Sequence, residues 1–366
     1  MRHEDLYLSS VASFLPRTVS VDDAVMDGRY DPEEQEESGV ERVAVAGPGD
    51  SAPAMAVRAA RAAVHRSPHE PGEIDLLLHA VTAYNGLDGW NAACYLQKEV
   101  LGGAGTSFEV RQLSNGAMAC VELAAAYLSA APDRRAALIT AADQFAEPAW
   151  DRWRTGWGMV FADGASAAVL SRVGGFARVR STVTVTDPEL EGLHRGELGF
   201  GAAPDPAEYP IDFRARTLDF ARSMDLAEAG RRMAAGLRDA VSEAADEAGI
   251  SAADADHYVV PGFGRRLLLR ECLDPLELDI GRSTWSWSAQ IGHLGAADQF
   301  AALAYLAEAG RLAPGDKAIA IGIGGGFNWT CIVLEVLEPP VWRDRPAPAA
   351  APEPAPHRAD LMEGEG

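Results

Sequence analysis

The sequence predicts an α/β protein built from two similar halves, and three observations favour that fold class. Two segments follow one plan, because SNGAMACVELAAAYLSAA leads into RRAALITAAD and GHLGAADQFAALAYLAEAG leads into DKAIAIGIGGG. In each, a loop of small residues enters an Ala-rich helix that is followed by an apolar strand. The segments align without gaps, and the alignment pairs Ala124, Ala126, Tyr127 and Leu128 with Ala302, Ala304, Tyr305 and Leu306. Finally, strand-like and helix-like patterns alternate along the chain.

The first half contains strands that are expected to be covered on both faces. Residues 76–84 and 136–143 are continuous apolar runs, which are typical of such strands. Between them, residues 117–130 are predicted to form the first of the two Ala-rich helices. Residues 161–173 and 174–186 are interpreted as a pair of strands that ends this half.

The second half repeats this plan after a charged loop region at 186–216. Residues 218–249 predict one long amphipathic helix, because apolar residues recur at helical spacing. These residues are Met224, Leu226, Met233, Leu237 and Val241. Strands are expected within 257–264, 317–326 and 330–338, with the second Ala-rich helix following His293. We therefore expect halves at 1–172 and 173–338, and a disordered Pro- and Ala-rich tail at 339–366.

Composition excludes several classes of protein. The chain has 366 residues, 48% of them hydrophobic, and a formal net charge of −22. No cluster of basic residues is present to bind phosphates, so no nucleic-acid partner is expected. No apolar run reaches about 18 residues and the N-terminus lacks a signal-peptide pattern, which predicts a cytoplasmic protein with no membrane partner. The cysteines and histidines show no metal-ligand spacing, so no metal site is expected.

The starts of the two Ala-rich helices carry the candidate catalytic residues. Ser114 precedes the first helix, while His293 and Asp298 stand at the start of the second. A nucleophile, a base and an orienting carboxylate from two related halves suggest one shared site. Each residue also has a purely structural interpretation: Ser114 as a helix cap, His293 as a hydrogen-bonded core residue and Asp298 as a carboxylate at a helix start.

Four segments give the chain a resemblance to a known family. FEVRQLSNGAMACVELAAAYL, FADGASAAVL, GHLGAADQF and GGGFNWT match, in order and at suitable distances, segments of the ketoacyl-ACP synthase III enzymes. The resemblance covers roughly residues 5–337. It implies a thiolase fold, in which duplicated βαβαβ halves form an αβαβα layered sandwich. It also implies a homodimer formed through the first half.

The chain departs from this family at its catalytic positions. Ser114 stands where the family has a cysteine nucleophile, and Cys120 further along the helix does not match that position. Gly262, in PGFG, falls where the family has a histidine, and His293 falls where it has an asparagine. A serine hydroxyl needs an adjacent base to attack a thioester, so His293 is assigned as that base. Asp298, five residues later, is assigned to orient the imidazole and stabilise its charged form.

Further site residues are implied by the resemblance. The amides of Ser114 and Gly325 would form the oxyanion hole. A branch of starter-unit enzymes from anthracycline-type polyketide pathways has Ser, His and Asp in these positions and a further His, which makes His194 an additional catalytic candidate. Family members hold CoA with a Trp and an Arg in a stretch that here reads DPEEQEESGVERVAV. CoA contacts are therefore transferred to Arg154 and Trp157, and Trp90 is a candidate for limiting the acyl chain.

The predicted activity is acyl transfer with no cofactor. Ser114 would take a short acyl group from acyl-CoA and pass it to a second substrate in polyketide or other natural-product biosynthesis. The preferred acceptor is an acyl carrier protein or malonyl-carrier protein, as in starter-unit priming. An O- or N-acyltransferase that acts on a sugar or another small-molecule acceptor is the alternative. A catalytically inactive ketosynthase-like scaffold is the third possibility.

Overall fold

Nine strands form the framework of the protein in a computed structural model, which describes residues 1–340 and 342. Five strands of the first half are neighbours in this order: β5 (Thr106–Val110), β4 (Ile74–Ala80), β6 (Ala136–Asp143), β7 (Gly164–Ser171) and β1 (Tyr7–Phe14). The second half continues with β8 (Ala177–Thr186), β11 (Asn328–Val336), β10 (Lys317–Gly324) and β9 (His257–Val259). Strands β1 and β8 share only two residue pairs, so the two sections of the sheet separate beyond that junction.

The strand order shows the duplication directly. In the first half β4 is parallel to β6, β6 is antiparallel to β7, and β7 is antiparallel to β1. In the second half β9, β10, β11 and β8 repeat the same sequence of parallel, antiparallel and antiparallel pairs. The expected boundary at 172/173 falls in the turn between β7 and β8. The strands at 161–173 and 174–186 both form, but they do not pair with each other, because β1 lies between them.

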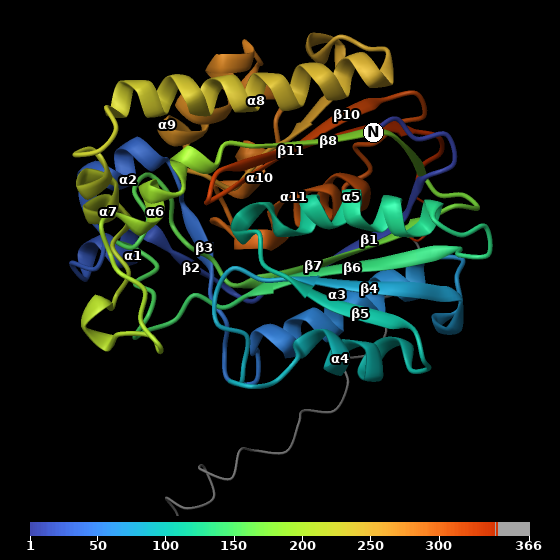
Figure 1. Cartoon of the computed structure of the whole chain (residues 1–366), viewed down its shortest axis with the longest axis horizontal. Helices are drawn as coiled ribbons and strands as arrows, with labels where there is room; N and C mark the ends of the chain where they lie inside the picture. Colours follow the sequence, from blue (N-terminus) through green and yellow to red (C-terminus); the bar gives the residue numbers. More distant parts are fainter. Residues whose placement is uncertain (341, 343–366) are drawn as a thin grey trace, which may run out of the picture.

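Helices complete five layers, as Figure 1 shows. Helices α5 (Gly116–Ser129) and α11 (Asp298–Glu308) lie between the two sections of the sheet. Helix α3 (Ala52–Arg66) covers the outer face of the first section and α8 (Leu226–Ala248) that of the second. This αβαβα arrangement confirms the predicted thiolase fold.

Shorter elements complete the fold. A two-stranded sheet consists of β2 (Thr18–Ser20) and β3 (Arg42–Ala44). The remaining α-helices are α1 (Val21–Met26), α2 (Pro32–Ser38), α4 (Ala92–Leu96), α6 (Gly192–Arg195), α7 (Phe213–Phe220), α9 (Arg265–Leu268) and α10 (Trp285–Ser288).

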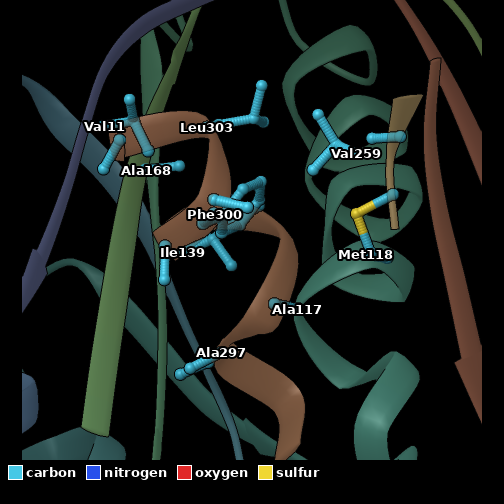
Figure 2. Packing of buried hydrophobic residues seen from close by; sticks show 14 of the residues in the cluster. Val11, Ala117, Met118, Ile139, Ala168, Val259, Ala297, Phe300 and Leu303 are labelled. Atoms are coloured by element: carbon cyan, nitrogen blue, oxygen red, sulfur yellow. The ribbon is translucent and has the colours of Figure 1, made fainter. Parts of the chain in front are cut away.

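The central helices bury most of their residues between the two sections of the sheet. Figure 2 shows Phe300 and Leu303 of α11 among strand residues of the first half, and Met118 of α5 beside Val259 of β9. All four side chains are at most 2% exposed. Small residues allow this close packing, since a Cβ added to Gly116 would lie 2.9 Å from the Cβ of Ala80. Both helix starts are thereby held near the centre of the molecule.

Two expectations from the sequence need correction. The helix expected at 218–249 is divided, because α7 ends at Phe220 and α8 begins at Leu226. Between them, the Ser223 hydroxyl donates to the Phe220 carbonyl and the Asp225 carboxylate accepts from the Ala227 amide. Such local bonds end one helix and start the next. The strand expected at 76–84 ends at Ala80, because the amides of Thr82 and Ala83 donate to the Asp143 carboxylate instead of to a strand.

Most of the tail expected at 339–366 lies outside the described residues. Trp342 is described, and its ring packs edge-on against Phe176 at 5.0 Å between centroids. Only 3% of this residue is exposed. Trp342 is therefore packed against the fold.

Candidate active site

Ser114 lies in the short turn that leads into α5. The preceding residue, Leu113, has a φ of 47°, a left-handed conformation that is uncommon for a residue with a side chain. This turn places the Ser114 hydroxyl at the N-terminal end of α5, facing the loop before α11. The hydroxyl oxygen lies 2.9 Å from Nε2 of His293.

Hydrogen bonds hold both the backbone amide and the backbone carbonyl of His293. Its amide donates to the Val160 carbonyl and its carbonyl accepts from the Ala162 amide, each at 2.8 Å. The ring lies between the rings of Phe161 and Phe263, with centroids 5.5 and 5.3 Å away. Only 1% of the residue is exposed. The imidazole therefore has a fixed position between apolar walls and presents Nε2 to Ser114.

Asp298 is the first residue of α11 and reaches back to the imidazole. Its Oδ2 lies 2.6 Å from Nδ1 of His293 and also accepts from the Gly262 amide at 2.7 Å. Its Oδ1 accepts from the Leu294 amide at 2.7 Å. The helix N-terminus and these amides stabilise a carboxylate at this place. The continuous contact from Ser114 through His293 to Asp298 has the geometry of a nucleophile, a base and an orienting acid.

Cys120 is unsuited to be a nucleophile. It is fully buried within α5, and burial raises the pKa of its thiol far above the ordinary value. Raising the pKa suppresses the reactive thiolate. Ser114, in the turn before α5, is therefore the side chain that meets the imidazole.

A cavity of about 190 Å³ opens from Ser114 and His293. Apart from these two residues and Gly325, its walls are mainly aromatic and aliphatic. They include Leu113, Trp150, Met159, Phe161, Leu193, Phe213, Met233, Phe263, Leu267, Ile323, Phe327 and Trp329. An apolar cavity next to a nucleophile suits the hydrocarbon part of an acyl group. Gly325 lines the cavity near Ser114, where the predicted oxyanion hole would lie.

His194 comes to the same cavity from α6. Its ring stacks on Phe213 at 4.3 Å, and burial lowers the pKa of His194 to about 4. The side chain is therefore neutral at pH 7. Nδ1 is buried against Gly325 and has no hydrogen-bond partner among the residues that the structure describes. The structure thus brings His194 to the wall of the site.

The predicted substrate-binding residues lie in three different places. Trp157 lines the catalytic cavity and is 42% exposed at its mouth. Arg154 instead lines an adjoining polar cavity and donates to the Gly28 carbonyl. Trp90 packs near Tyr95 at 5.4 Å between ring centroids and does not line the catalytic cavity of its own chain. Of the three, Trp157 alone reaches the site within one chain.

A buried carboxylate connects the two halves beside the site. Asp143, at the end of β6, accepts from the amides of Thr82 and Ala83 through Oδ1 and from the Ala296 amide through Oδ2. Burial raises the pKa of Asp143 to about 6. This residue therefore braces the loop after β4 against the start of α11.

Several residues of the site were not identified from the sequence. The aromatic walls gave no signal, because buried aromatic residues are common in any core. Arg214 and Arg270, whose guanidinium groups lie 5.3 and 5.8 Å from the Trp157 ring centroid, come from separate elements. The Gly262 amide was also missed, since a backbone donor leaves no sequence signal.

Within residues 1–340 and 342, no group of three or more His, Cys, Asp or Glu side chains is placed to hold a metal ion. No helix in that part of the chain is both long and apolar enough to cross a bilayer.

Comparison with known proteins identifies the family. The sequence model of the 3-oxoacyl-[acyl-carrier-protein] synthase III family matches residues 108–188, and the sequence model of the C-terminal part of that family matches residues 245–336. The beta-ketoacyl-[acyl-carrier-protein] synthase III of Brucella suis is 23% identical over 304 residues, covering 81% of this chain and 88% of that protein.

Solved structures show the same relationship. An acyltransferase, ChlB3, is 37% identical with a TM-score of 0.88, covering 93% of this chain and all of that one. The priming β-ketosynthase of the R1128 polyketide pathway has a TM-score of 0.75 at 21% identity, covering 92% of this chain and 98% of that one. Fold and site together define a transferase of the thiolase superfamily. The chain belongs to the 3-oxoacyl-[acyl-carrier-protein] synthase III family.

Proposed function

We propose that this protein is an acyltransferase that takes a short acyl group from acyl-CoA onto Ser114 and passes it to a second substrate in polyketide or related natural-product biosynthesis. The observation that carries this proposal is the contact from Ser114 to His293 at 2.9 Å and on to Asp298 at 2.6 Å, at the end of an apolar cavity. The substitution of the family's cysteine by serine is thus accompanied by the base that a serine requires.

The proposed first half-reaction forms an ester and releases a thiol. His293 Nε2 accepts the hydroxyl proton as the Ser114 oxygen bonds to the thioester carbonyl carbon. The carbon–sulfur bond then breaks, and the imidazolium returns that proton to the departing CoA sulfur. In the second half-reaction His293 removes a proton from the acceptor, which attacks the ester and restores the Ser114 hydroxyl. Asp298 holds Nδ1 protonated throughout and stabilises the imidazolium.

The mouth of the cavity has groups suited to the phosphates of CoA. Arg214 and Arg270 flank Trp157. Arg270 is paired with Glu271 at 2.7 Å, whereas Arg214 has no ion pair with any residue in the described part of the chain. Guanidinium groups bind phosphates well. Arg214→Ala with Arg270→Ala should raise KM for acyl-CoA about 10-fold or more, while leaving KM for a short acyl-N-acetylcysteamine thioester nearly unchanged. Arg231→Ala, on the exposed face of α8, is the matched control. An equal rise for both thioesters would contradict a phosphate role.

The preferred acceptor is the thiol of a carrier protein in starter-unit priming. Condensation with a malonyl-carrier protein is less favoured, since Gly262 supplies no imidazole at the position where condensing relatives have one. The second candidate acceptor is a hydroxyl or amine of a small molecule, and the 37% identity to a protein described as an acyltransferase favours keeping it. His194, neutral and at the cavity wall, is proposed to contact whichever acceptor enters.

Intact-mass measurement after exposure to acyl-CoA tests the enzyme against the inactive scaffold. The wild-type chain should gain the mass of one acyl group, and Ser114→Ala should gain none. Ser129→Ala, at the other end of α5, is the matched serine control and should be acylated normally. No adduct with any short acyl-CoA would favour the scaffold.

A competition experiment identifies the acceptor. The acylated protein is mixed with holo-carrier protein, malonyl-carrier protein and a sugar alcohol, separately and together. Transfer to the holo-carrier thiol supports starter-unit priming, whereas an ester of the alcohol supports the small-molecule alternative. Release of carbon dioxide with a ketoacyl product would show a condensing enzyme.

We further propose a homodimer formed through the first half. Strand β5 is at the edge of the sheet, and Phe108 on it is 53% exposed. Tyr84 and Leu87, in the loop between β4 and α4, are 57% and 59% exposed. An exposed apolar edge of this kind invites pairing with a second chain. Light scattering should give the mass of a dimer for the wild type and of a monomer for Phe108→Glu; a monomeric wild type would refute the assembly.

A further inference from the structure

Gly262 lies directly beneath the Asp298 carboxylate. It lies in the segment that follows β9, and its amide donates to Oδ2 of Asp298 at 2.7 Å. That oxygen is the same one that lies 2.6 Å from Nδ1 of His293. The Gly262 amide and the imidazole therefore share one carboxylate oxygen.

No side chain fits at position 262 in this arrangement. A Cβ added there would lie 2.9 Å from Oδ1 of Asp298, 2.9 Å from the Gly292 carbonyl oxygen and 3.1 Å from Cα of His293. Contacts this short require the carboxylate or the backbone to move. Gly262 does not have a positive φ, so the requirement for glycine is one of space.

The two amides determine where the carboxylate points. Gly262 holds Oδ2 and the Leu294 amide holds Oδ1, both at 2.7 Å. With both oxygens fixed, Oδ2 faces Nδ1 of His293 and keeps the proton on that nitrogen. Nε2 then has its lone pair free for the Ser114 hydroxyl. If the carboxylate moved, the proton would no longer be held on Nδ1, and Nε2 would lose the free lone pair that it needs to act as a base.

We propose that Gly262 is a positioning residue for Asp298, and that their close approach excludes a side chain at the position where condensing relatives have a histidine. An imidazole at 262 and a carboxylate at 298 would compete for one space. The chain has the carboxylate, so no imidazole stands at position 262. Because this assignment rests on the proposed function, acylation of Ser114 in the wild type is established first.

The test is a double-mutant cycle between Gly262→Ala and Asp298→Asn. Single-turnover acylation of Ser114 by acyl-CoA is measured by intact mass. Gly262→Ala should slow acylation about 10²-fold and Asp298→Asn about 10³-fold, with the acyl-CoA concentration for half-maximal rate nearly unchanged. The double variant should be within about 3-fold of Asp298→Asn alone, because both changes disturb the same carboxylate. The proposal would be overturned if the rate losses of the two single variants multiplied in the double variant. It would also be overturned if Gly262→Ala were acylated at the wild-type rate.

Gly264→Ala is the matched steric control. A Cβ there would lie 2.6 Å from the Gly158 carbonyl oxygen and 2.8 Å from the side chain of Ser38, so its nearest neighbours belong to other residues than Asp298. It should lower the melting temperature yet retain acylation within about 10-fold of wild type. The positioning role would be overturned if Gly264→Ala slowed acylation as much as Gly262→Ala does and were equally non-additive with Asp298→Asn. The effect of Gly262→Ala would then be one of general disruption.

Amide hydrogen exchange tests the same contact if Gly262→Ala does not fold. In Asp298→Asn the Gly262 amide should exchange faster than in the wild type, while amides of β10 keep their rates. Unchanged exchange at Gly262 would overturn the proposal. Absence of any Ser114 adduct, by contrast, would refute the proposed function itself.

Discussion

The buried ion pair between Arg152 and Asp163 supports the aromatic wall of the cavity, and its removal should be strongly destabilising. Nη2 of Arg152 lies 3.0 Å from Oδ2 of Asp163 and donates to the Phe145 carbonyl, while Nη1 donates to the Phe161 carbonyl. The Asp163 side chain is only 1% exposed and the Arg152 side chain 14%. Phe145 and Phe161 are in ring contact at 4.6 Å.

Arg152→Met leaves a buried carboxylate without its counter-charge and two carbonyls without a donor. Breaking a buried pair from one side costs about 3–5 kcal/mol. We therefore expect the free energy of unfolding to fall by about 4 kcal/mol, measured by chemical denaturation with fluorescence detection. Asp163→Asn in the same background should restore only about 1 kcal/mol. It removes the unpaired charge, but the amides of Ala46 and Phe145 donate to the two Asp163 oxygens, and one of them would then face the asparagine NH2 group.

An exposed pair supplies the control. Arg231 and Glu228 on α8 have side chains 67% and 44% exposed, and Arg231→Met should change the free energy of unfolding by only about 0–1 kcal/mol. If Arg152→Met were as mild as Arg231→Met, the low-dielectric argument for this pair would be wrong. A double variant no more stable than Arg152→Met would also refute it.

Two further predictions concern packing and acid stability. A Cβ at Gly236 would overlap the Trp329 ring, so Gly236→Ala should lose about 1–3 kcal/mol in a denaturant melt; Gly230→Ala, on the same helix with open space, should gain about 0.5–1 kcal/mol. Equal effects would contradict the packing argument. Burial lowers the pKa of His79 from 6.5 to about 3. Below pH 6.5 this histidine is therefore protonated in the unfolded chain but neutral in the folded chain. As the pH decreases toward 3, the free energy of unfolding falls by up to about 1.4 kcal/mol per pH unit because of this residue. His79→Gln should have a shallower acid decline between pH 7.5 and 4.5, and parallel curves would contradict it. Asp143 has the opposite effect on stability. Its pKa is raised to about 6 in the folded chain, so the folded chain takes up a proton there before the unfolded chain does, and the free energy of unfolding rises as the pH falls through 6.

Elements with continuous local patterns were predictable from the sequence. The strand at 136–143 coincides with β6, and the helix at 117–130 lies within one residue of α5. Strand β6 is buried throughout and α5 buries most of its residues, so nearly every residue carries the same apolar signal. The divided helix at 218–249 was not predictable by that route. Its amphipathic spacing continues across 221–225, while the side-chain bonds of Ser223 and Asp225 interrupt the backbone there.

The candidate site shows the same division. The matching segments indicated Ser114 and His293, and the five-residue spacing indicated Asp298, because these residues belong to short motifs. Trp157 was identified as a candidate, but the two arginines beside it come from other elements and carry no motif. Trp90 was identified from its neighbourhood in the sequence and lies away from the cavity of its own chain.

The sequence by itself determined the duplicated α/β plan, the two buried helices and the residue types at their starts. Burial and helix formation depend on neighbours in the chain, and those neighbours are visible in the sequence. Only the tertiary structure decided that β1 separates β7 from β8, that His194 reaches the cavity wall, and that the Gly262 amide meets Asp298. These are contacts between segments far apart in the chain. They arise from how the layers pack, and a backbone amide or an empty Cβ position has no signature of its own in the sequence.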